Sequence, residues 1–153
     1  MSAKTPVSSL EDHIGYWLRY VSNHVSHSFA RRLSNEDVTV SEWVALRCLY
    51  DLEEGSQNEL ADAMGMTKAP VSRILDRLAA KKLVRRMESA EDGRARLIRL
   101  TEQGRALVPK LAKLADANDH AFFSCLSGKE QAAIVNAMRK LVAHHELAHL
   151  PTG

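Results

Sequence analysis

Cysteine is scarce in this chain of 153 residues, and its scarcity excludes two kinds of architecture. The two cysteines, Cys48 and Cys125, both lie inside apolar stretches. A disulfide framework needs more cysteines than this, and so does a cysteine-rich metal site. We therefore expect two reduced, buried thiols and no metal ligands of this kind.

Long apolar runs and enzyme motifs are also missing. No stretch approaches the roughly 18 apolar residues of a membrane span, and residues 1–6 contain no apolar core of the signal-peptide type. The sequence has no repeat, no low-complexity segment, no phosphate-binding glycine-rich loop and no nucleophilic serine motif. These absences predict a cytoplasmic protein without a membrane partner, a cofactor or a catalytic activity.

The remaining composition is that of an ordinary globular domain. Hydrophobic residues make up 45% of the chain and charged residues 26%. At this length, folding buries about two thirds of the surface that the unfolded chain exposes. We expect a single domain over residues 1–153.

Positive charge is concentrated in one segment. Residues 67–99 contain ten Lys and Arg against four Asp and Glu, a local charge of +6 in a chain whose net charge is +2. Such a patch suits a polyanionic partner. A solvated helix face with scattered cations is the alternative, and charge alone does not separate the two.

Helix boundaries are marked by capping pairs, in which Ser or Thr is followed three residues later by Glu. Together with the spacing of apolar residues, they predict six helices. Gly55, after Glu54, is expected to end the second helix, and Pro109 is expected to kink the fifth. The pairs are Ser8/Glu11, Thr39/Glu42, Ser56/Glu59 and Ser127/Glu130, and the helices cover about residues 9–33, 39–53, 56–64, 67–81, 101–124 and 127–149.

Between the fourth and fifth helices the apolar period changes from helical to alternating. Residues 84–88 and 96–100 alternate on either side of a polar stretch, which predicts a basic two-stranded hairpin. Two strands alone are marginal in water, so the hairpin must pack against the helices.

The third and fourth helices, joined by a tight turn at Gly65, match a helix-turn-helix whose second helix enters the DNA major groove. The hairpin then forms a wing. Gln57 and Asn58 suit phosphate contacts, Arg94 suits a narrow minor groove, and Asp92 can hold a neighbouring arginine. Further candidates are Thr67, Lys68, Ala69, Pro70, Ser72 and Arg73 for base contacts, and Arg77, Arg85 and Arg86 for phosphates.

Several motifs resemble the MarR family of bacterial winged-helix regulators, over about residues 12–110. They are residues 60–66 (LADAMGM), 71–78 (VSRILDRL), 83–86 (LVRR) and 91–104, with Asp92-x-Arg94 and Leu100-Thr101-x-x-Gly104 as the most diagnostic pieces. The resemblance implies a mainly α fold with a small β-hairpin wing, residues 39–100 binding DNA and residues 8–34 and 101–150 forming a homodimer. It further implies a pseudo-palindromic operator and repression that a small aromatic ligand relieves.

One position departs from the family pattern. Lys82 stands where a glycine normally ends the fourth helix before Leu-Val. Either Lys82 adopts a left-handed conformation, at about 1–2 kcal/mol, or the helix ends differently. The angle of the wing depends on which alternative holds.

The resemblance places an effector between the dimerisation helices and the winged part. The cations Arg19, His24 and Arg47 could bind a carboxylate, and Trp43 could stack on an aromatic ring. The alternatives are that Trp43 is core and that Tyr20 and His24 belong to a dimer interface. The polar side chains form two flanks of the first helix, Arg19, Ser22, Asn23 and Ser26 on one and Tyr20, His24 and Ser28 on the other. A small aromatic acid is the expected effector.

A second class of function stays open, a metal- or redox-sensing regulator built on the same fold. His145-Glu146-x-x-His149 matches the zinc-protease pattern, but only four residues follow it, and a chain end does not hold a water-excluded catalytic metal. A regulatory metal would need other histidines, and a redox sensor would use Cys48, beside Arg47. The other histidines are His13, His24, His27 and His120.

Overall fold

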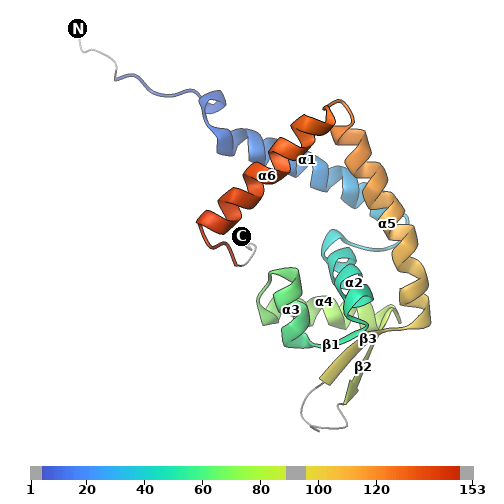
Figure 1. Ribbon diagram of the computed structural model, residues 1–153. Coiled ribbons are helices and arrows are strands. Elements are labelled where there is room, and N and C mark those ends of the chain that lie inside the picture. Colours follow the sequence, from blue (N-terminus) through green and yellow to red (C-terminus); the bar gives the residue numbers. More distant parts are fainter. Residues whose placement is uncertain (1–4, 89–95, 149–153) are drawn as a thin grey trace.

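The computed structural model describes residues 5–88 and 96–148 and divides into two parts (Figure 1). Helices α1, α5 and α6 form one part, and α2 to α4 with a small sheet form the other. None of the helices described is both long and apolar enough to cross a membrane. The elements in chain order are a 3-10 turn at Leu10–Asp12, α1 Ile14–Ser34, α2 Val40–Leu52, β1 Glu54–Ser56, α3 Gln57–Met64, α4 Lys68–Ala80, β2 Val84–Glu88, β3 Arg96–Leu100, α5 Glu102–Phe123 and α6 Gly128–His144.

Three of the four predicted capping pairs start helices as expected. The hydroxyl oxygens of Thr39, Ser56 and Ser127 each accept a hydrogen bond from the backbone N–H of the Glu three residues later, at 3.1, 3.1 and 3.2 Å. Each bond satisfies an N–H that has no partner inside the helix.

The N-terminal boundary differs from the prediction. Ser9, not Ser8, begins the ordered turn, because its backbone N–H donates to the Asp12 carboxylate at 2.8 Å. This turn is a separate 3-10 element, and α1 starts only at Ile14. At Thr67, where the fourth helix is predicted to begin, the side chain makes no capping hydrogen bond, although α4 does start at the next residue.

The last helix is shorter than predicted. It ends at His144 instead of near His149, because Glu146 adopts a left-handed conformation with φ 50°. His145 and Glu146 therefore lie beyond the helix, and His149 lies outside the described residues. The helical spacing that a zinc-protease site requires is not formed at His145 and Glu146.

The sheet contains one strand more than the sequence predicts. β2 and β3 form the expected antiparallel hairpin, and β1 pairs with the other edge of β3. α2 ends at Leu52, close to the predicted end at about residue 53, but Gly55 does not make the stop: the C-cap is Glu53, with φ 62°, and Gly55 pairs with Ile98 inside the sheet. A strand of three residues is too short to show an alternating pattern.

Most of the hydrophobic core lies in the part formed by α2 to α4 and the sheet, which we call the winged part. Leu46, Leu49, Leu60, Leu75 and Leu78 are completely buried there. α5 extends into this core through Val108 and Leu111, whereas no residue of α6 is buried. Most of the core therefore belongs to the winged part, with Leu33 of α1 and the two residues of α5 added to it, and the apolar side of α6 is left open.

A tight joint connects the start of α5 to the turn before β2. Thr101 Oγ1 donates to the carbonyl of Lys82 at 2.7 Å and accepts from the N–H of Gly104 at 3.0 Å. A Cβ on Gly104 would lie 2.1 Å from the carbonyl oxygen of Leu83, so only glycine fits. Lys82 takes the left-handed alternative, with φ 62°. α5 continues through Pro109 as one uninterrupted helix.

Candidate nucleic-acid interface

α4 has the two faces that a recognition helix requires. Val71, Ile74, Leu75 and Leu78 are buried against the winged core. The opposite face of the first turns is open to solvent. Among the residues predicted to contact DNA, Thr67, Lys68, Ala69, Arg73 and Arg77 are exposed, and Pro70 and Ser72 are partly buried.

The turn between α3 and α4 brings the start of α3 against the start of α4. Gly65 ends α3 with φ 65°, a conformation that costs glycine nothing. Gln57 Nε2 then donates to the carbonyl of Lys68 at 3.3 Å. Of the two predicted phosphate-binding residues, Gln57 thus contacts the first turn of α4, and Asn58, which follows it in α3, is exposed.

The C-terminal end of α4 is anchored by a buried carboxylate. Glu42 is 1% exposed, and Lys81 Nζ lies 2.8 and 3.2 Å from its two oxygens. The same ammonium donates to the carbonyl of Asp37 at 2.6 Å, and Arg77 Nε lies 3.9 Å from Glu42. The sequence predicted Glu42 only as a capping residue. The contact with Lys81 joins residues 39 positions apart, and local spacing carries no signal for it.

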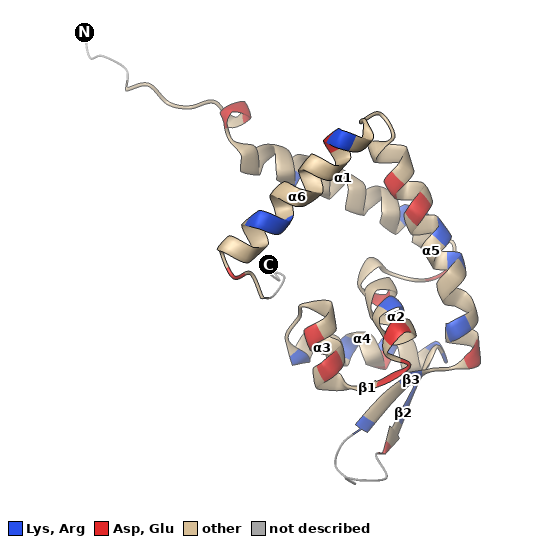
Figure 2. Ribbon diagram, viewed as in Figure 1, with Lys and Arg blue, Asp and Glu red and all other residues tan. Residues whose placement is uncertain are grey.

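The wing contributes several cations whose environments differ. Arg86 Nη1 donates to the Asp76 carboxylate at 2.6 Å, and Arg99 pairs with Glu54 across β1 and β3 at 2.7 Å. Each of these two guanidinium groups is thus paired with a carboxylate of the same chain. Figure 2 shows red segments on α3 and β1 and blue segments on the two longer strands. Exposed cations on or near α4 and on the strands include Lys68, Arg73, Lys82, Arg85 and Arg96. The predicted wing residues Asp92 and Arg94 lie outside the described residues.

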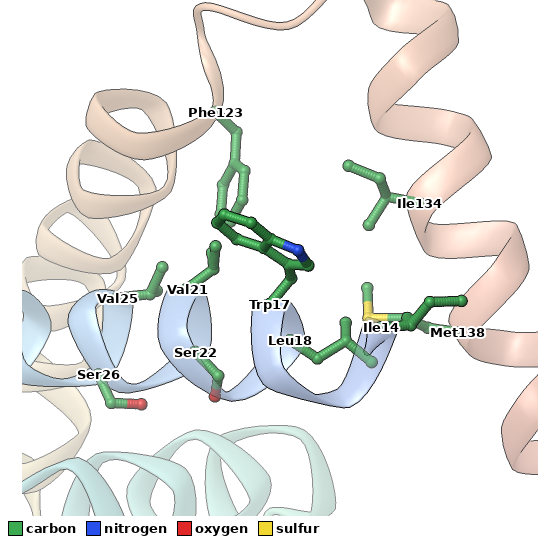
Figure 3. Close-up of a pocket in the computed structure, with 10 residues that line it drawn as sticks. All are labelled: Ile14, Trp17, Leu18, Val21, Ser22, Val25, Ser26, Phe123, Ile134 and Met138. Atoms are coloured by element: carbon green, nitrogen blue, oxygen red, sulfur yellow. The ribbon is translucent and has the colours of Figure 1, made fainter. Parts of the chain in front are cut away.

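A mostly apolar cavity of about 420 Å³ lies between α1, α5 and α6 (Figure 3). Phe123 and Ile134 face Trp17 across it, while Ser22 and Ser26 point to the opposite side of α1. Of the residues predicted to bind an effector, Ser22 and Ser26 border this cavity, although their hydroxyl groups point away from its aromatic side. The others, Arg19, Asn23, His24, Ser28, Trp43 and Arg47, do not line it, and its lining is Ile14, Trp17, Leu18, Val21, Ser22, Val25, Ser26, Phe123, Ile134 and Met138.

Two predicted effector residues, both on α2, have partners within the described residues. The Trp43 ring packs edge-on against Phe29, with centroids 6.2 Å apart, at the border of the hydrophobic core. Arg47 forms an ion pair with Asp51 at 2.7 Å and lies over the Tyr50 ring. Trp43 is thus partly buried and packed against the core, which is what its alternative role requires.

The two thiols differ from the expected buried pair. Cys48 is half-buried, and this burial raises the pKa of its thiol, against a smaller lowering by Arg47. Cys125 is exposed, so the prediction of a buried thiol is wrong there. Within residues 5–88 and 96–148 no three His, Cys, Asp or Glu side chains are grouped as metal ligands.

A helix-turn-helix followed by an antiparallel wing defines a winged helix-turn-helix protein. Comparison with known proteins gives the same result. The family model described as MarR family matches residues 38–95, and the transcriptional regulator HosA of Escherichia coli O157:H7 is 31% identical over 106 residues, 69% of this chain and 78% of HosA. The chain belongs to the MarR family of transcriptional regulators.

Two further relatives match almost the whole chain. The HTH-type transcriptional repressor NicR of Pseudomonas putida is 28% identical over 157 residues, 97% of this chain and 99% of NicR. The solved structure of BpsR from Bordetella bronchiseptica superposes with a TM-score of 0.82 at 27% identity, covering 89% of this chain and 97% of that one. That structure concerns regulation of the DNA binding of BpsR by 6-hydroxynicotinic acid.

Proposed function

We propose that the protein is a repressor that inserts α4 into the major groove of an operator. The observation that carries the proposal is the polar, basic and exposed first part of α4, held by a buried apolar face. Exposed side chains at the start of such a helix reach base edges, and flanking cations bind phosphates. The proposed contacts are Gln57, Asn58, Thr67, Lys68, Ala69, Pro70, Ser72, Arg73 and Arg77, with Asp92 and Arg94 from the wing sequence.

We further propose that the operator-binding species is a homodimer. The apolar side chains along α1 and α6 are exposed, among them Leu18 at 44% and Leu141 at 46%. Exposed apolar surface of this extent marks an interface, and a twofold arrangement would cover both copies with the same residues. Residues 8–34 and 101–150 would form the dimer, and residues 39–100 of each copy would reach half-sites roughly 34–36 Å apart.

A small aromatic acid is the proposed effector. BpsR, the structural neighbour described above, responds to a hydroxylated ring acid that contains nitrogen. In this chain Ser22 and Ser26 border the cavity but point to the opposite side of α1, and both belong to the flank that also carries Arg19 and Asn23. Hydroxyl and amide groups suit ring substituents, and a guanidinium suits a carboxylate. The effector would then bind on the serine side of α1, and the partner copy would cover the Phe123 side (Figure 3).

Fluorescence anisotropy tests this function directly. The protein is titrated onto duplex DNA from upstream of its own gene and onto a scrambled duplex, at low and moderate salt, with and without aromatic acids. We expect tight, salt-sensitive binding that prefers the first duplex and is released by one of the acids. Arg73→Ala serves as the internal control, because it should reduce the preference while leaving the fold intact. Equal, weak binding to both duplexes would contradict the proposal.

A further inference from the structure

Arg86 of the wing reaches back to the recognition helix. Its Nη1 donates to Asp76 Oδ1 at 2.6 Å, and its Nη2 lies 3.4 Å from the carbonyl oxygen of Ser72. The Arg86 side chain is 26% exposed and that of Asp76 is 63% exposed. One guanidinium thus contacts two residues of α4 from the middle of β2.

The two acceptors lie one helical turn apart on α4. The planar fork of arginine holds its donors in fixed relative positions, so contacts from two nitrogens restrict the orientation of the helix more than one contact would. Ser72 lies in the part of α4 proposed to face the bases. The geometry of Arg86 is therefore coupled to the segment that would read DNA.

The ends of α4 have polar anchors of their own. Gln57 holds the carbonyl of Lys68 at the start of the helix, and Lys81 holds the buried Glu42 at its end. Neither anchor involves the wing strands. Among the hydrogen bonds of the described residues, those from Arg86 link the middle of α4 to β2.

We propose that Arg86 is a positioning residue for DNA binding, which sets the angle between α4 and the wing through Asp76. The sequence predicts a phosphate contact for Arg86, but its guanidinium is directed to α4, whereas the neighbouring Arg85 is exposed. This proposal rests on the proposed function, because the angle matters only if helix and wing engage one duplex together.

Arg86 could position α4 or contact a phosphate directly, and these two roles predict opposite effects of Asp76→Asn on the affinity for DNA. A carboxylate near DNA repels phosphates, so Asp76→Asn would strengthen binding or leave it unchanged if Arg86 and Asp76 acted separately. If Asp76 holds Arg86 in place, Asp76→Asn weakens binding. The direction of the change therefore distinguishes positioning from direct contact.

The experiment compares the parent protein with Arg86→Met, Asp76→Asn and the double variant. The probe is the duplex that the parent selects from a random pool, so that no operator sequence is assumed. We expect each single variant to lose affinity by about two- to thirtyfold, as residues that couple without contact do. The double variant should bind no more weakly than Arg86→Met, because both changes remove the same tie.

The salt dependence gives an independent readout. Affinity falls as salt rises, and each lost phosphate contact makes the plot of log affinity against log salt less steep, by about 0.9 in slope. Arg86→Met should keep the parental slope. Arg85→Met, which removes the same charge from the same strand, should make this dependence less steep, because the sequence predicts a phosphate contact for Arg85 and its side chain is exposed.

Three results would overturn the positioning role. They are a lowered salt slope in Arg86→Met, unchanged or stronger binding by Asp76→Asn, and additive losses in the double variant. Thermal unfolding checks that each variant folds, and if Arg86→Met does not fold, Asp76→Asn carries the test alone. If the parent selects no duplex at all, the proposed function itself fails, which is a different result from a failure of positioning.

Discussion

Lys82, which follows the recognition helix, and Gly104, in the first turn of α5, lie on the two sides of the joint from which the wing leaves that helix. Lys82 has φ 62°, in the region where a side chain with a Cβ is strained. Gly104 lies so close to the carbonyl of Leu83 that a Cβ would be 2.1 Å from its oxygen. The strain at Lys82 is therefore maintained by the close packing of α5 on the following residue.

Lys82→Gly should stabilise the protein. Glycine adopts this conformation without the steric cost that lysine bears, and the expected increase in the free energy of unfolding is about 1 kcal/mol. Urea unfolding measures the change, and Lys82→Ala, which keeps a Cβ, is the matched control with little expected gain. An unchanged or lower stability in Lys82→Gly would show that the backbone at this position is not strained.

Cys48 should react slowly and only at alkaline pH. Burial raises the pKa of its thiol above the ordinary value of 9.0, so the reactive thiolate is a smaller fraction at neutral pH. In the Cys125→Ser protein, the alkylation rate of Cys48 should keep rising above pH 9.0 and should be lower than in the urea-unfolded chain. A rate that levels off below this pH would instead favour the redox-sensing alternative.

The helix α4 is held in place by polar contacts at its two ends as well as by its buried apolar face. Lys81 at its C-terminal end contacts Glu42 of α2 and the carbonyl of Asp37, which follows α1. The recognition helix is thereby connected to the segment that leads out of α1.

Lys81→Met should destabilise the winged part. It leaves the Glu42 carboxylate buried with only Arg77 nearby, at 3.9 Å, and an uncompensated buried charge costs roughly 3 kcal/mol. Urea unfolding measures the loss. Glu42→Gln in the Lys81→Met background should recover part of it, because the charge is removed, and no recovery would contradict the account of this anchor.

The elements that could be predicted from the sequence are those with local signals. Capping pairs at Thr39, Ser56 and Ser127 located three helices, and the alternating residues located β2 and β3. β1 could not be predicted, because three residues carry no pattern and its pairing partner is β3, more than forty residues later. The end of α6 was missed because it depends on the left-handed backbone of Glu146, a residue that does not normally signal a stop.

The same distinction holds for the candidate site. The exposed residues at the start of α4 could be predicted, because helical spacing determines which residues face solvent. The partners of Lys81 and Arg86 could not, since Glu42 and Asp76 are brought to them by packing between separate elements. Trp43 was predicted ambiguously because an aromatic residue at a helical apolar position suits both a core and a ring-stacking site.

At the scale of the whole molecule, the protein has one well-buried part and one incomplete part. The winged part encloses its own core, whereas α6 buries none of its residues and Met138 and Leu141 remain open to solvent. In the proposed dimer, a second copy of the chain packs against this exposed apolar side of α6. Dimerisation would also determine the distance between the two recognition helices.

Met138→Glu should dissociate the dimer. A charge placed on the apolar side of α6 would have to be buried without a partner. The molar mass measured by light scattering after size exclusion should fall from that of a dimer to that of a monomer. The affinity for the operator should also fall, because the contact with the second half-site is lost. Asn136→Glu, which places the same charge on the same helix, is the control. Equal masses for the parent and Met138→Glu would contradict the proposed interface.

The claim that α4 reads DNA is tested most directly by photocrosslinking from the helix itself. A photoreactive residue in place of Ala69, on the exposed face of α4, is irradiated on the duplex that the protein selects. We expect crosslinks at two positions about one DNA turn apart, roughly 34–36 Å, and none from the same residue placed at Asn136 on α6. Crosslinks from position 136 with none from position 69 would contradict it.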